Sequence, residues 1–383
     1  MLPNTTAADK DLLELINKNS IIIPIDSLNE AEREKVIKNI QPSSIDLRIG
    51  NLIWLMKGAC RPMKNETVSQ LLHNNSVKEL ELDDFLLLRD RVYVVKLQEM
   101  VNIQEYARIR TNAKSSSGRL DLQVRLLADH TPHYDSVNGP YQGELYAEIS
   151  SNSFDCFLTS GGVAFNQMRY SLGNSTMPDD EIRSVLKTYP FLYTKNGERC
   201  ENGEISIDGG LVLTLDLNGD HTNSEIIGYR AKRYGTSLVD IHKIAAHPIA
   251  DFFDPIEKPK NKEITLEPGY FYLLSTNEAI SLPPGFAGEL AQFDSHLGHI
   301  TSHYAGFFDP GWGYFSREEK QGNTATLEIR VHNKLETVRD GQPISVLRLE
   351  RMAQNPMLIY GEKERKSHYA RQIGVRYGKH FRE

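Results

Sequence analysis

Hydrophobic and polar positions alternate along most of the chain in short runs. Near the start, Leu12, Leu13, Leu15 and Ile16 follow a helical spacing, so we expect a helix before the β-branched run that Pro24 ends. Beyond it, short β-branched and aromatic stretches are separated by Gly, Asn, Asp and Pro, as in antiparallel sheets. The strands expected from this pattern cover residues 91–97, 107–113, 144–150, 205–217, 270–276, 325–331 and 344–352. The pattern predicts a mainly β protein of the sandwich or barrel type with a few short helices.

The same succession of elements occurs twice along the chain. Residues 85–170 and residues 264–352 each contain the same series: a strand, a loop, a polar turn, a hairpin, and a Gly-containing turn before a last strand. We interpret this as two diverged copies of one β domain, residues 1–195 and 196–383, joined near "KTYPFLYTKNGERCENGE". A rhythm shared by two unrelated antiparallel domains is the alternative explanation.

Composition narrows the class of protein. The net charge of −7 argues against non-specific attraction to nucleic acid or anionic lipid, so neither is expected as a partner. The three cysteines are too far apart for a CxxC pair, as is usual in a reducing compartment. No signal-peptide pattern and no apolar run of about 20 residues occurs. These features predict a soluble, cytoplasmic protein.

The segment "NAKSSSGRL" gathers cations and hydroxyls around a glycine. A tight turn there can direct Lys114, Ser115, Ser116, Ser117 and Arg119 at phosphate oxygens. An ordinary polar surface turn is the competing interpretation.

The segment "FFDPGWGY" predicts a turn wrapped in aromatic rings. Pro310 sets φ for the second turn position and Gly311 suits the positive φ of the third, as in a type II turn. Asp309 can then accept a bond from a sugar hydroxyl, while Phe308 or Trp312 offers a face to a sugar or base. A packed aromatic corner explains the pattern equally well.

A glutamate stands on one predicted strand of each copy. Glu328 alternates with Leu327 and Ile329, and Glu148 is its counterpart in the first copy. If such a carboxylate points inward, desolvation raises its pKa towards the range of a general base. An outward, solvated glutamate is the alternative.

The segment "IQPSSIDLRIG" places Asp46 and Arg48 on one side of a strand. There they can pair with each other or support a neighbouring loop.

Five stretches in order resemble the motifs of the dCTP deaminase and dUTPase superfamily. They are "IQPSSIDLRIG", "KSSSGRLDL", "HITSHYAGFFDPGWGY", "ATLEIRVHN" and "GQPISVLRLERM". The long, duplicated bacterial form of dCTP deaminase is the most similar. The resemblance implies two tandem dUTPase-like (β-clip) barrels and a homo-oligomer. It also implies hydrolytic deamination of dCTP to dUTP without zinc, with Mg²⁺ bound through the substrate triphosphate.

The resemblance also assigns residues. It places the phosphate turn on Lys114, Ser115, Ser116 and Arg119, and the closing C-terminal segment, with Tyr369 and Gln372, at "KSHYARQIG". It places the nucleoside hairpin on His303, Ala305, Phe308, Asp309 and Trp312. The catalytic glutamate falls on Glu328 or Glu148.

Each copy departs from the family pattern in a different half of the site. The leading arginine of the turn is Lys114, and the second copy carries Asp294 in its own turn, where it would repel phosphate. The first copy lacks the Asp-Pro-Gly turn, although Asp135 stands nearby. We therefore expect a composite pocket, with the first copy holding the phosphates and the second holding the nucleoside and water.

Glu328 would take a proton from the attacking water, give it to N3 of cytosine and later protonate the departing ammonia. A zinc route is not expected, because HxE followed by PCxxC is absent from the sequence. Two alternatives stay open: a dUTP pyrophosphatase or bifunctional enzyme giving dUMP, and a nucleotide-binding regulator without catalysis.

Overall fold

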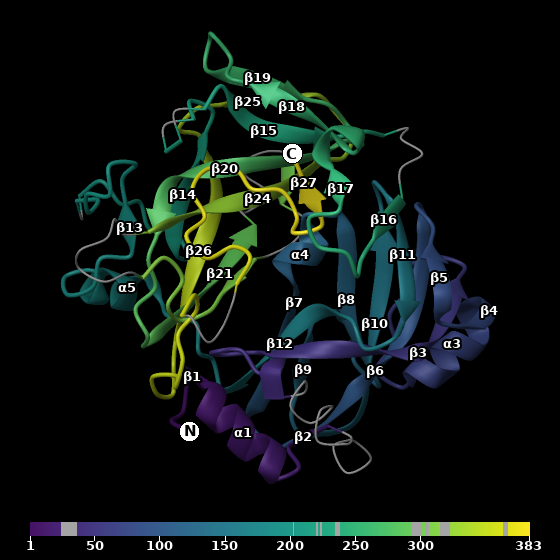
Figure 1. Ribbon diagram of the computed structural model, residues 1–383. Helices are drawn as coiled ribbons and strands as arrows, with labels where there is room; N and C mark the ends of the chain where they lie inside the picture. The colour runs from purple at the N-terminus through teal and green to yellow at the C-terminus, as the bar shows by residue number, and fades with distance from the viewer. Residues whose placement is uncertain are drawn as a thin grey trace. The chain divides into compact units, whose positions relative to one another are not determined.

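The computed structural model describes residues 1–23, 37–201, 203–219, 221–222, 224–233, 238–292, 300–302, 306–314, 322–362 and 367–383. They form two compact, mainly β units (Figure 1). The first comprises Met1–Ser175 and Thr236–Ala246, and the second comprises Thr176–Gly235 and His247–Glu383. The sequence analysis set the domain boundary at residues 195–196, whereas the compact units separate at 175–176. The expected architecture, two tandem β domains with a few short helices, is confirmed.

The first unit contains the strands β1 to β12, together with β16. Its elements are β1 (Thr5–Thr6), α1 (Asp9–Asn17), β2 (Ile21–Ile22), β3 (Ile45–Met56), α3 (Val68–Asn75), β4 (Ser76–Glu81), β5 (Asp83–Leu87), β6 (Arg91–Ile103), β7 (Ala107–Ala113), α4 (Ser115–Gly118), β8 (Leu122–Ala128), β9 (Ser136–Asn138), β10 (Tyr141–Ser151), β11 (Asp155–Ser160), β12 (Ala164–Leu172) and β16 (Leu238–Asp240).

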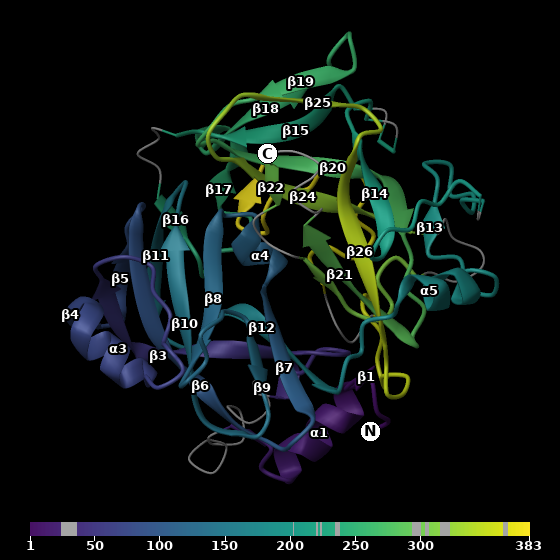
Figure 2. The same cartoon turned by 180° about the vertical axis from the view of Figure 1, so that it is seen from behind.

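The second unit contains the other described elements (Figure 2). They are α5 (Asp179–Val185), β13 (Leu192–Tyr193), β14 (Leu211–Asp216), β15 (Ile226–Ala231), β17 (His247–Pro248), the 3₁₀ turn η1 (Ile249–Asp251), β18 (Phe253–Glu257), β19 (Glu263–Leu266), β20 (Phe271–Ile280), β21 (Phe286–Gln292), β22 (Ile300–Ser302), β23 (Phe307–Phe308), β24 (Asn323–Val331), β25 (Glu336–Arg339), β26 (Pro343–Arg351) and β27 (Phe381–Arg382).

Strand pairing confirms the internal duplication. In the first unit the strands pair in the order β8, β10, β6, β3, β12, β7, β9. In the second, β22, β24, β20, β14, β26, β21 and β23 pair in the same way. Each step in one series has its counterpart in the other, so β10 with Glu148 and β24 with Glu328 are equivalent strands.

Side-chain hydrogen bonds close the N-terminal ends of α1 and α3. At α1 the Ala8 N–H donates to Asp11 Oδ2 at 2.9 Å. At α3 the Gln70 N–H donates to Thr67 Oγ1 at 3.2 Å and the Thr67 N–H donates to Gln70 Oε1 at 2.9 Å. These bonds satisfy backbone donors that the first helical turn leaves without partners. None of the helices in the described part of the chain has the length and apolar character needed to cross a bilayer.

The predicted strands agree with the structure except in one place. Residues 205–217 were expected to form one strand, but β14 begins only at Leu211. Gly209 and Gly210 have φ of +67° and +144°, and Ile207 makes an isolated bridge to Leu211. The glycine pair therefore turns the chain just before the strand, because positive φ is incompatible with an extended strand.

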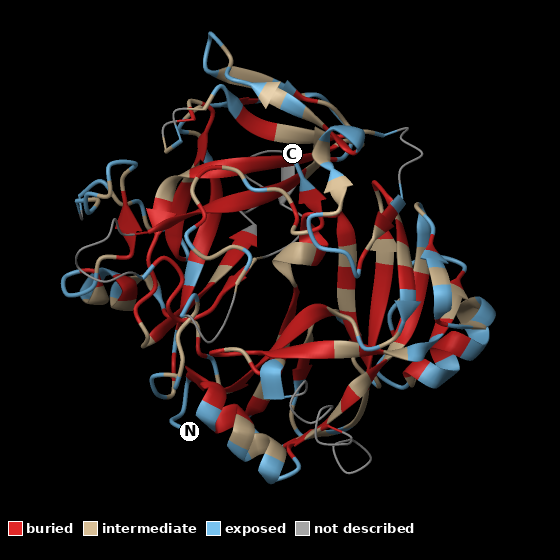
Figure 3. Ribbon diagram, viewed as in Figure 1, coloured by how far each residue is buried: buried red, intermediate tan, exposed pale blue. Residues whose placement is uncertain are grey.

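The central strands β20 and β24 of the second unit are buried along most of their length (Figure 3). Ala325, Leu327 and Ile329 of β24 belong to the core of this unit, together with Leu347 of β26. Because side chains alternate along a strand, Thr324, Thr326 and Glu328 project from the opposite face.

Leu347→Ala should lower the free energy of unfolding by about 2–5 kcal/mol, because this fully buried side chain (0% exposed) would leave a cavity. Leu335→Ala, at a 65% exposed position, should stay within about 0.5 kcal/mol of the parent. Urea denaturation followed by circular dichroism measures both. Equal effects of the two changes would contradict this placement of the core.

Candidate active site

Glu328 lies on the face of β24 that points away from the apolar core. Its neighbours Leu327 and Ile329 enter the core, so of the two directions left open by the sequence the Glu328 side chain takes the one away from the apolar core. Glu328 is nevertheless only 6% exposed. It is therefore a buried carboxylate on a strand face that also carries the hydroxyls of Thr324 and Thr326, which is a polar rather than an apolar setting.

The C-terminal segment crosses this face of β24 (Figure 1). Gln372 Nε2 donates to Thr324 O and to Thr326 Oγ1, each at 2.9 Å. Both amide hydrogens of Gln372 are thus directed at β24. A donor role towards phosphate would need another arrangement of this side chain, so that role stays a prediction.

Tyr369, the other residue predicted in the closing segment, takes part in its internal bonding. The Lys379 N–H donates to Tyr369 Oη at 3.1 Å, and the Tyr369 N–H donates to Ser367 Oγ at 3.2 Å. These bonds fold residues 367–379 into a compact stretch.

The hairpin of the second unit has the predicted turn. The Trp312 N–H donates to Asp309 O at 3.1 Å, and Gly311 has φ of +98°. This is the positive φ that a type II turn requires at its third position. A Cβ on Gly311 would stand 2.6 Å from Ile359 Cβ and 2.7 Å from Tyr360 N, so close packing also requires glycine here.

The aromatic rings of the hairpin pack against each other and against Tyr360 at tilted angles. The ring centroids of Phe308 and Trp312 are 4.6 Å apart, and those of Trp312 and Tyr360 are 5.1 Å apart. Phe308, Asp309 and Trp312 are all buried. The rings therefore form a packed corner, as the competing interpretation proposed, and this corner also fixes the position of Asp309.

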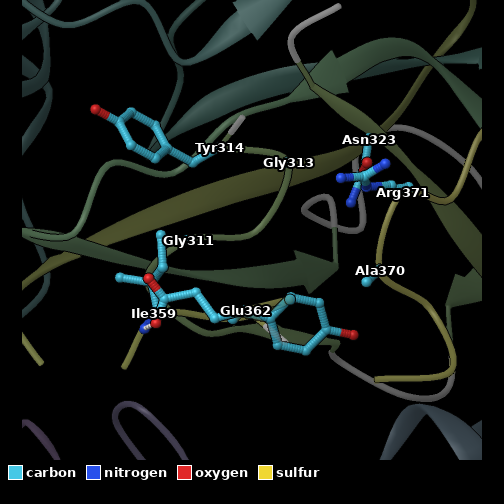
Figure 4. A pocket seen from close by; sticks show the side chains of 10 residues that line it. Gly311, Gly313, Tyr314, Asn323, Ile359, Glu362, Ala370 and Arg371 are labelled. Carbon is cyan, nitrogen blue, oxygen red and sulfur yellow. Dashed lines mark hydrogen bonds between the residues drawn. The ribbon is translucent and has the colours of Figure 1, made fainter. Parts of the chain in front are cut away.

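A cavity of about 220 Å³ opens beside this corner (Figure 4). The hairpin and the C-terminal segment line it with Gly311, Gly313, Tyr314, Asn323, Ile359, Tyr360, Gly361, Glu362, Ala370 and Arg371. Among the described residues, Asn323 Oδ1 is buried and has no hydrogen-bond partner, and the same holds for the indole N–H of Trp312. Buried polar atoms of this kind are normally satisfied by protein, water or ligand, so the cavity suits a polar guest.

Three predicted or discussed positions cannot be compared with the structure. His303 and Ala305 of the predicted nucleoside site lie outside the described residues, as does Asp294.

In the first unit the phosphate turn forms α4 and its flanks. Lys114 precedes the helix and pairs through Nζ with Asp46 Oδ2, a buried carboxylate on β3. Asp46 thus supports the neighbouring turn, which is one of the two roles expected for it. Lys114, Ser115 and Ser116 are partly exposed, whereas Arg119 is buried, at 3% exposure.

Arg48 does not pair with Asp46. Its Nε and its backbone N–H donate to the two carboxylate oxygens of Glu99, each at 2.7 Å. Burial raises the pKa of Glu99, and the charge and bonds of Arg48 oppose that rise. The two residues of "SIDLRIG" thus support different neighbours.

Glu148, the counterpart of Glu328, is enclosed by its own unit. Its Oε2 accepts from the Cys60 N–H at 2.9 Å, and its Oε1 accepts from the Tyr134 hydroxyl at 3.1 Å. The carboxylate is 6% exposed, and burial raises its pKa while these two donors oppose the rise. In this conformation both oxygens are already bound by protein.

The loop that carries Cys60 is tied to the segment that carries Tyr134. Arg61 Nε donates to Pro132 O at 2.8 Å, and the His130 N–H donates to Glu66 O at 2.9 Å. The guanidinium of Arg125 lies 4.7 Å from the centre of the Tyr134 ring. Residues 57–67 therefore form a bonded cover over Glu148.

Asp135, which stands near the missing turn of the first copy, is part of the same structure. It accepts from the Leu126 N–H at 2.7 Å and pairs with Arg125 Nε at 2.5 Å. Burial raises the pKa of Asp135, and Arg125 opposes the rise. These contacts give Asp135 a structural role.

The partners of both glutamate strands were not predicted from the sequence. Cys60 stands 88 positions from Glu148, and no local pattern connects the two. Thr324 and Thr326 could have been noticed, because the spacing Thr-x-Thr-x-Glu puts three polar groups on one strand face.

Family models for 2'-deoxycytidine 5'-triphosphate deaminase (DCD) match both parts of the chain. The C-terminal domain model matches residues 180–381 and the N-terminal domain model matches residues 9–174. The chain belongs to the dCTP deaminase family. The predicted resemblance is thereby confirmed, including its duplicated form.

Relatives and a solved structure agree with this membership. A "dCTP deaminase, dUMP-forming" of Streptomyces griseus subsp. griseus is 33% identical over 134 residues, which are 34% of this chain and 65% of the relative. A protein of the same name from Corynebacterium diphtheriae is 35% identical over 122 residues, 31% of this chain and 60% of the relative. The chain thus spans less than two thirds of the length of these curated relatives.

The crystal structure of 2'-deoxycytidine 5'-triphosphate deaminase from Agrobacterium tumefaciens is 29% identical to this dCTP deaminase family member. The match has a TM-score of 0.80 and covers 92% of this chain and 99% of that chain. The duplicated β architecture is therefore shared along almost the whole length.

The buried carboxylate of Glu148 predicts how the stability of the protein depends on pH. Because burial raises its pKa, folded Glu148 keeps its proton to higher pH than the unfolded chain does, where a glutamate titrates near about 4.3. Its contribution to stability therefore falls as pH rises from the unfolded pKa through the folded pKa. The difference in unfolding free energy between Glu148→Gln and the parent should move in favour of the variant over that window.

Urea denaturation from pH 4 to 8 measures this difference. Trp54 fluorescence in a Trp312→Phe background reports on the first unit, because the chain has two tryptophans. A difference that is independent of pH, or that favours the parent as pH rises, would contradict the burial of a titrating Glu148.

Proposed function

We propose that this protein deaminates dCTP by hydrolysis, giving dUTP and ammonia, with Glu328 as the general acid and base. Membership of the dCTP deaminase family supports the substrate and the reaction. The observation that carries the choice of residue is the position of Glu328. It is a buried carboxylate on the polar face of β24, which the C-terminal segment crosses.

In the proposed reaction, Glu328 removes a proton from water as the oxygen attacks C4 of cytosine. The proton passes to N3, so the ring accepts the electron pair without building a full negative charge. Collapse of the tetrahedral intermediate then breaks the C4–N4 bond, and Glu328 delivers the second proton of the water to the departing amine. One dCTP and one water give one dUTP and one ammonia, and the carboxylate is regenerated.

We assign nucleoside positioning to the hairpin corner. Asp309 would accept a hydrogen bond from a deoxyribose hydroxyl, and the packed rings of Phe308 and Trp312 would support the sugar or the base. The corner holds these groups in place before a ligand arrives, which reduces the entropy lost on binding.

We assign the triphosphate to the turn of the first repeat, with Mg²⁺ entering as part of the substrate. Lys114 and Arg119 supply positive charge, and Ser115 and Ser116 supply hydroxyl donors. The pairing of Lys114 with Asp46 holds the ammonium at one position of the turn. The C-terminal residues Tyr369 and Gln372 are proposed to complete the enclosure of the substrate.

Glu148 receives a structural role in this proposal. Its two oxygens are bound by Cys60 and Tyr134, and the cover of residues 57–67 lies over it. A water or a nucleobase would have to displace these donors to reach the carboxylate. One of the two repeats is thus proposed to have kept the catalytic glutamate while the other uses its glutamate for packing.

A second candidate is the combined reaction that ends at dUMP. The curated relatives carry the name "dCTP deaminase, dUMP-forming". On this alternative, a second water would cleave the triphosphate of the uracil nucleotide and release pyrophosphate.

We further propose a homo-oligomer of the cytoplasm. The free state of Cys60, Cys156 and Cys200 supports a reducing compartment. Sedimentation of the purified chain, with and without nucleotide, tests the assembly.

The products decide between the candidate functions. Incubation of the purified protein with dCTP and Mg²⁺ should release one ammonia for each dUTP formed, measured by an ammonia assay and by chromatography of the nucleotides. Appearance of dUMP with one pyrophosphate would favour the combined reaction. Binding of dCTP without either product would overturn the proposal in favour of a regulator.

Glu328→Gln should lower kcat by about 10²–10⁴-fold with a smaller effect on dCTP binding, because it removes the proton carrier and keeps the shape. Glu148→Gln is the matched comparison and should retain turnover. Steady-state ammonia release and calorimetric binding of dCTP measure the two effects. Loss of turnover in Glu148→Gln with normal turnover in Glu328→Gln would exchange the two roles.

A further inference from the structure

We infer that Thr326 is a positioning residue. Its hydroxyl holds the C-terminal segment across the face of β24 that carries Glu328. The kinetic part of this inference rests on the proposed deaminase function, and the structural part does not.

The location of Thr326 follows from strand geometry. It stands two residues before Glu328, so both side chains leave the same face of β24, roughly 7 Å apart along the strand. Thr326 is 8% exposed, and the residues on either side of it, Ala325 and Leu327, are in the core. The hydroxyl is therefore buried next to the proposed catalytic carboxylate.

One oxygen of Thr326 receives two donors from the C-terminal segment. Gln372 Nε2 donates to Thr326 Oγ1 at 2.9 Å, and the backbone N–H of Arg376 donates to the same atom at 3.1 Å. A side chain and a backbone group four positions apart thus converge on one acceptor. Gly374 lies between Gln372 and Arg376 in the chain, and its carbonyl oxygen accepts a hydrogen bond from Thr324 Oγ1 at 3.1 Å.

These bonds fix the orientation of Gln372. Its second amide hydrogen is bound by Thr324 O at 2.9 Å, so β24 accepts both hydrogens of the amide. Gln372 is 1% exposed, and an amide hydrogen left without a partner at such a site is unfavourable. Removing the Thr326 hydroxyl would free the amide to rotate and would release the Arg376 N–H at the same time.

The segment is held independently on either side of this stretch. The Lys379 N–H binds Tyr369 Oη at 3.1 Å, and β27 pairs with β17. Phe381 packs against Phe253, with ring centroids 5.4 Å apart. Loss of the Thr326 bonds should therefore loosen residues 372–376 without releasing the C-terminus.

Thr326→Val is the direct test, because valine keeps the branched shape and removes the acceptor. We expect KM for dCTP to rise about tenfold, as loss of two buried hydrogen bonds predicts, with kcat changed less than about threefold. Thr326→Ser keeps the oxygen and should restore KM to within about twofold of the parent.

Thr265→Val is the matched control. Thr265 is an exposed threonine on β19 whose hydroxyl lies 3.0 Å from Thr337 Oγ1, so it loses the same kind of bond away from β24. Its KM and kcat should equal those of the parent.

A second measurement does not depend on any activity. Trypsin cleavage after Arg371 and Arg376 of the nucleotide-free protein, followed by mass spectrometry, reports how firmly this stretch is held. Thr326→Val should be cut several-fold faster there, while Thr326→Ser and Thr265→Val should match the parent. If dCTP is not a substrate, this result still supports or overturns the structural part.

A double-mutant cycle keeps the inference testable if the valine variant folds poorly. Thr326→Ala and Gln372→Ala should each raise KM, and the double variant should raise it by less than the product of the two single effects, because the two residues share one bond. Multiplicative effects, a serine variant as impaired as the valine variant, or unchanged cleavage in Thr326→Val would each overturn the positioning role.

Discussion

A carboxylate that is removed from water needs hydrogen-bond donors, and the structure depends on this constraint in both repeats. The equivalent strands β10 and β24 each bury a glutamate at 6% exposure. Desolvation of such a group is costly unless donors surround it. What covers each strand therefore decides what its glutamate can do. In β10 the cover is a loop of the same unit, whereas a C-terminal segment crosses β24.

Duplication explains how two similar strands came to differ. The order of strand pairing is the same in the two units, so the backbone presents both glutamates in the same way. The Cys60 N–H and the Tyr134 hydroxyl bind the first one as internal donors, and the bonds around them tie residues 57–67 to the segment 129–134. In the second unit the corresponding face carries the Thr326 hydroxyl, which accepts from the side chain of residue 372 and the backbone N–H of residue 376. The two units share the fold, whereas the segments that lie over the two glutamate strands have diverged.

The glycine-rich corner of the second unit shows how local and distant constraints combine. The Asp-Pro-Gly sequence alone specifies the turn, because proline sets one φ and glycine permits the next, at +98°. Its packing against Ile359 and Tyr360 is equally demanding, since a Cβ on Gly311 would stand 2.6 Å from Ile359. The turn therefore serves both as a local bend and as a wall of the cavity beside Asn323.

Sequence reasoning was most successful where the physics is local. Strand alternation, the type II turn, the first helix and the repeated order of elements all depend on neighbours a few positions apart, and the structure confirms them. It failed at residues 205–210, where two glycines with positive φ replace the expected start of a strand. The direction of the Glu328 side chain stayed open between two alternatives, and the core positions of Leu327 and Ile329 place it on the other face of the strand.

By itself, the sequence determined the β architecture, its duplication and the family, because these follow from periodicity and from motifs that each occupy a few consecutive residues. Only the tertiary structure decided that Asp46 holds Lys114, that Cys60 and Tyr134 occupy Glu148, and that Thr326 binds Gln372. These partners are 14 to 88 positions apart in the chain. A hydrogen bond forms only when both groups are within about 3 Å, and no property of either residue's neighbours reveals which distant donor the fold brings there.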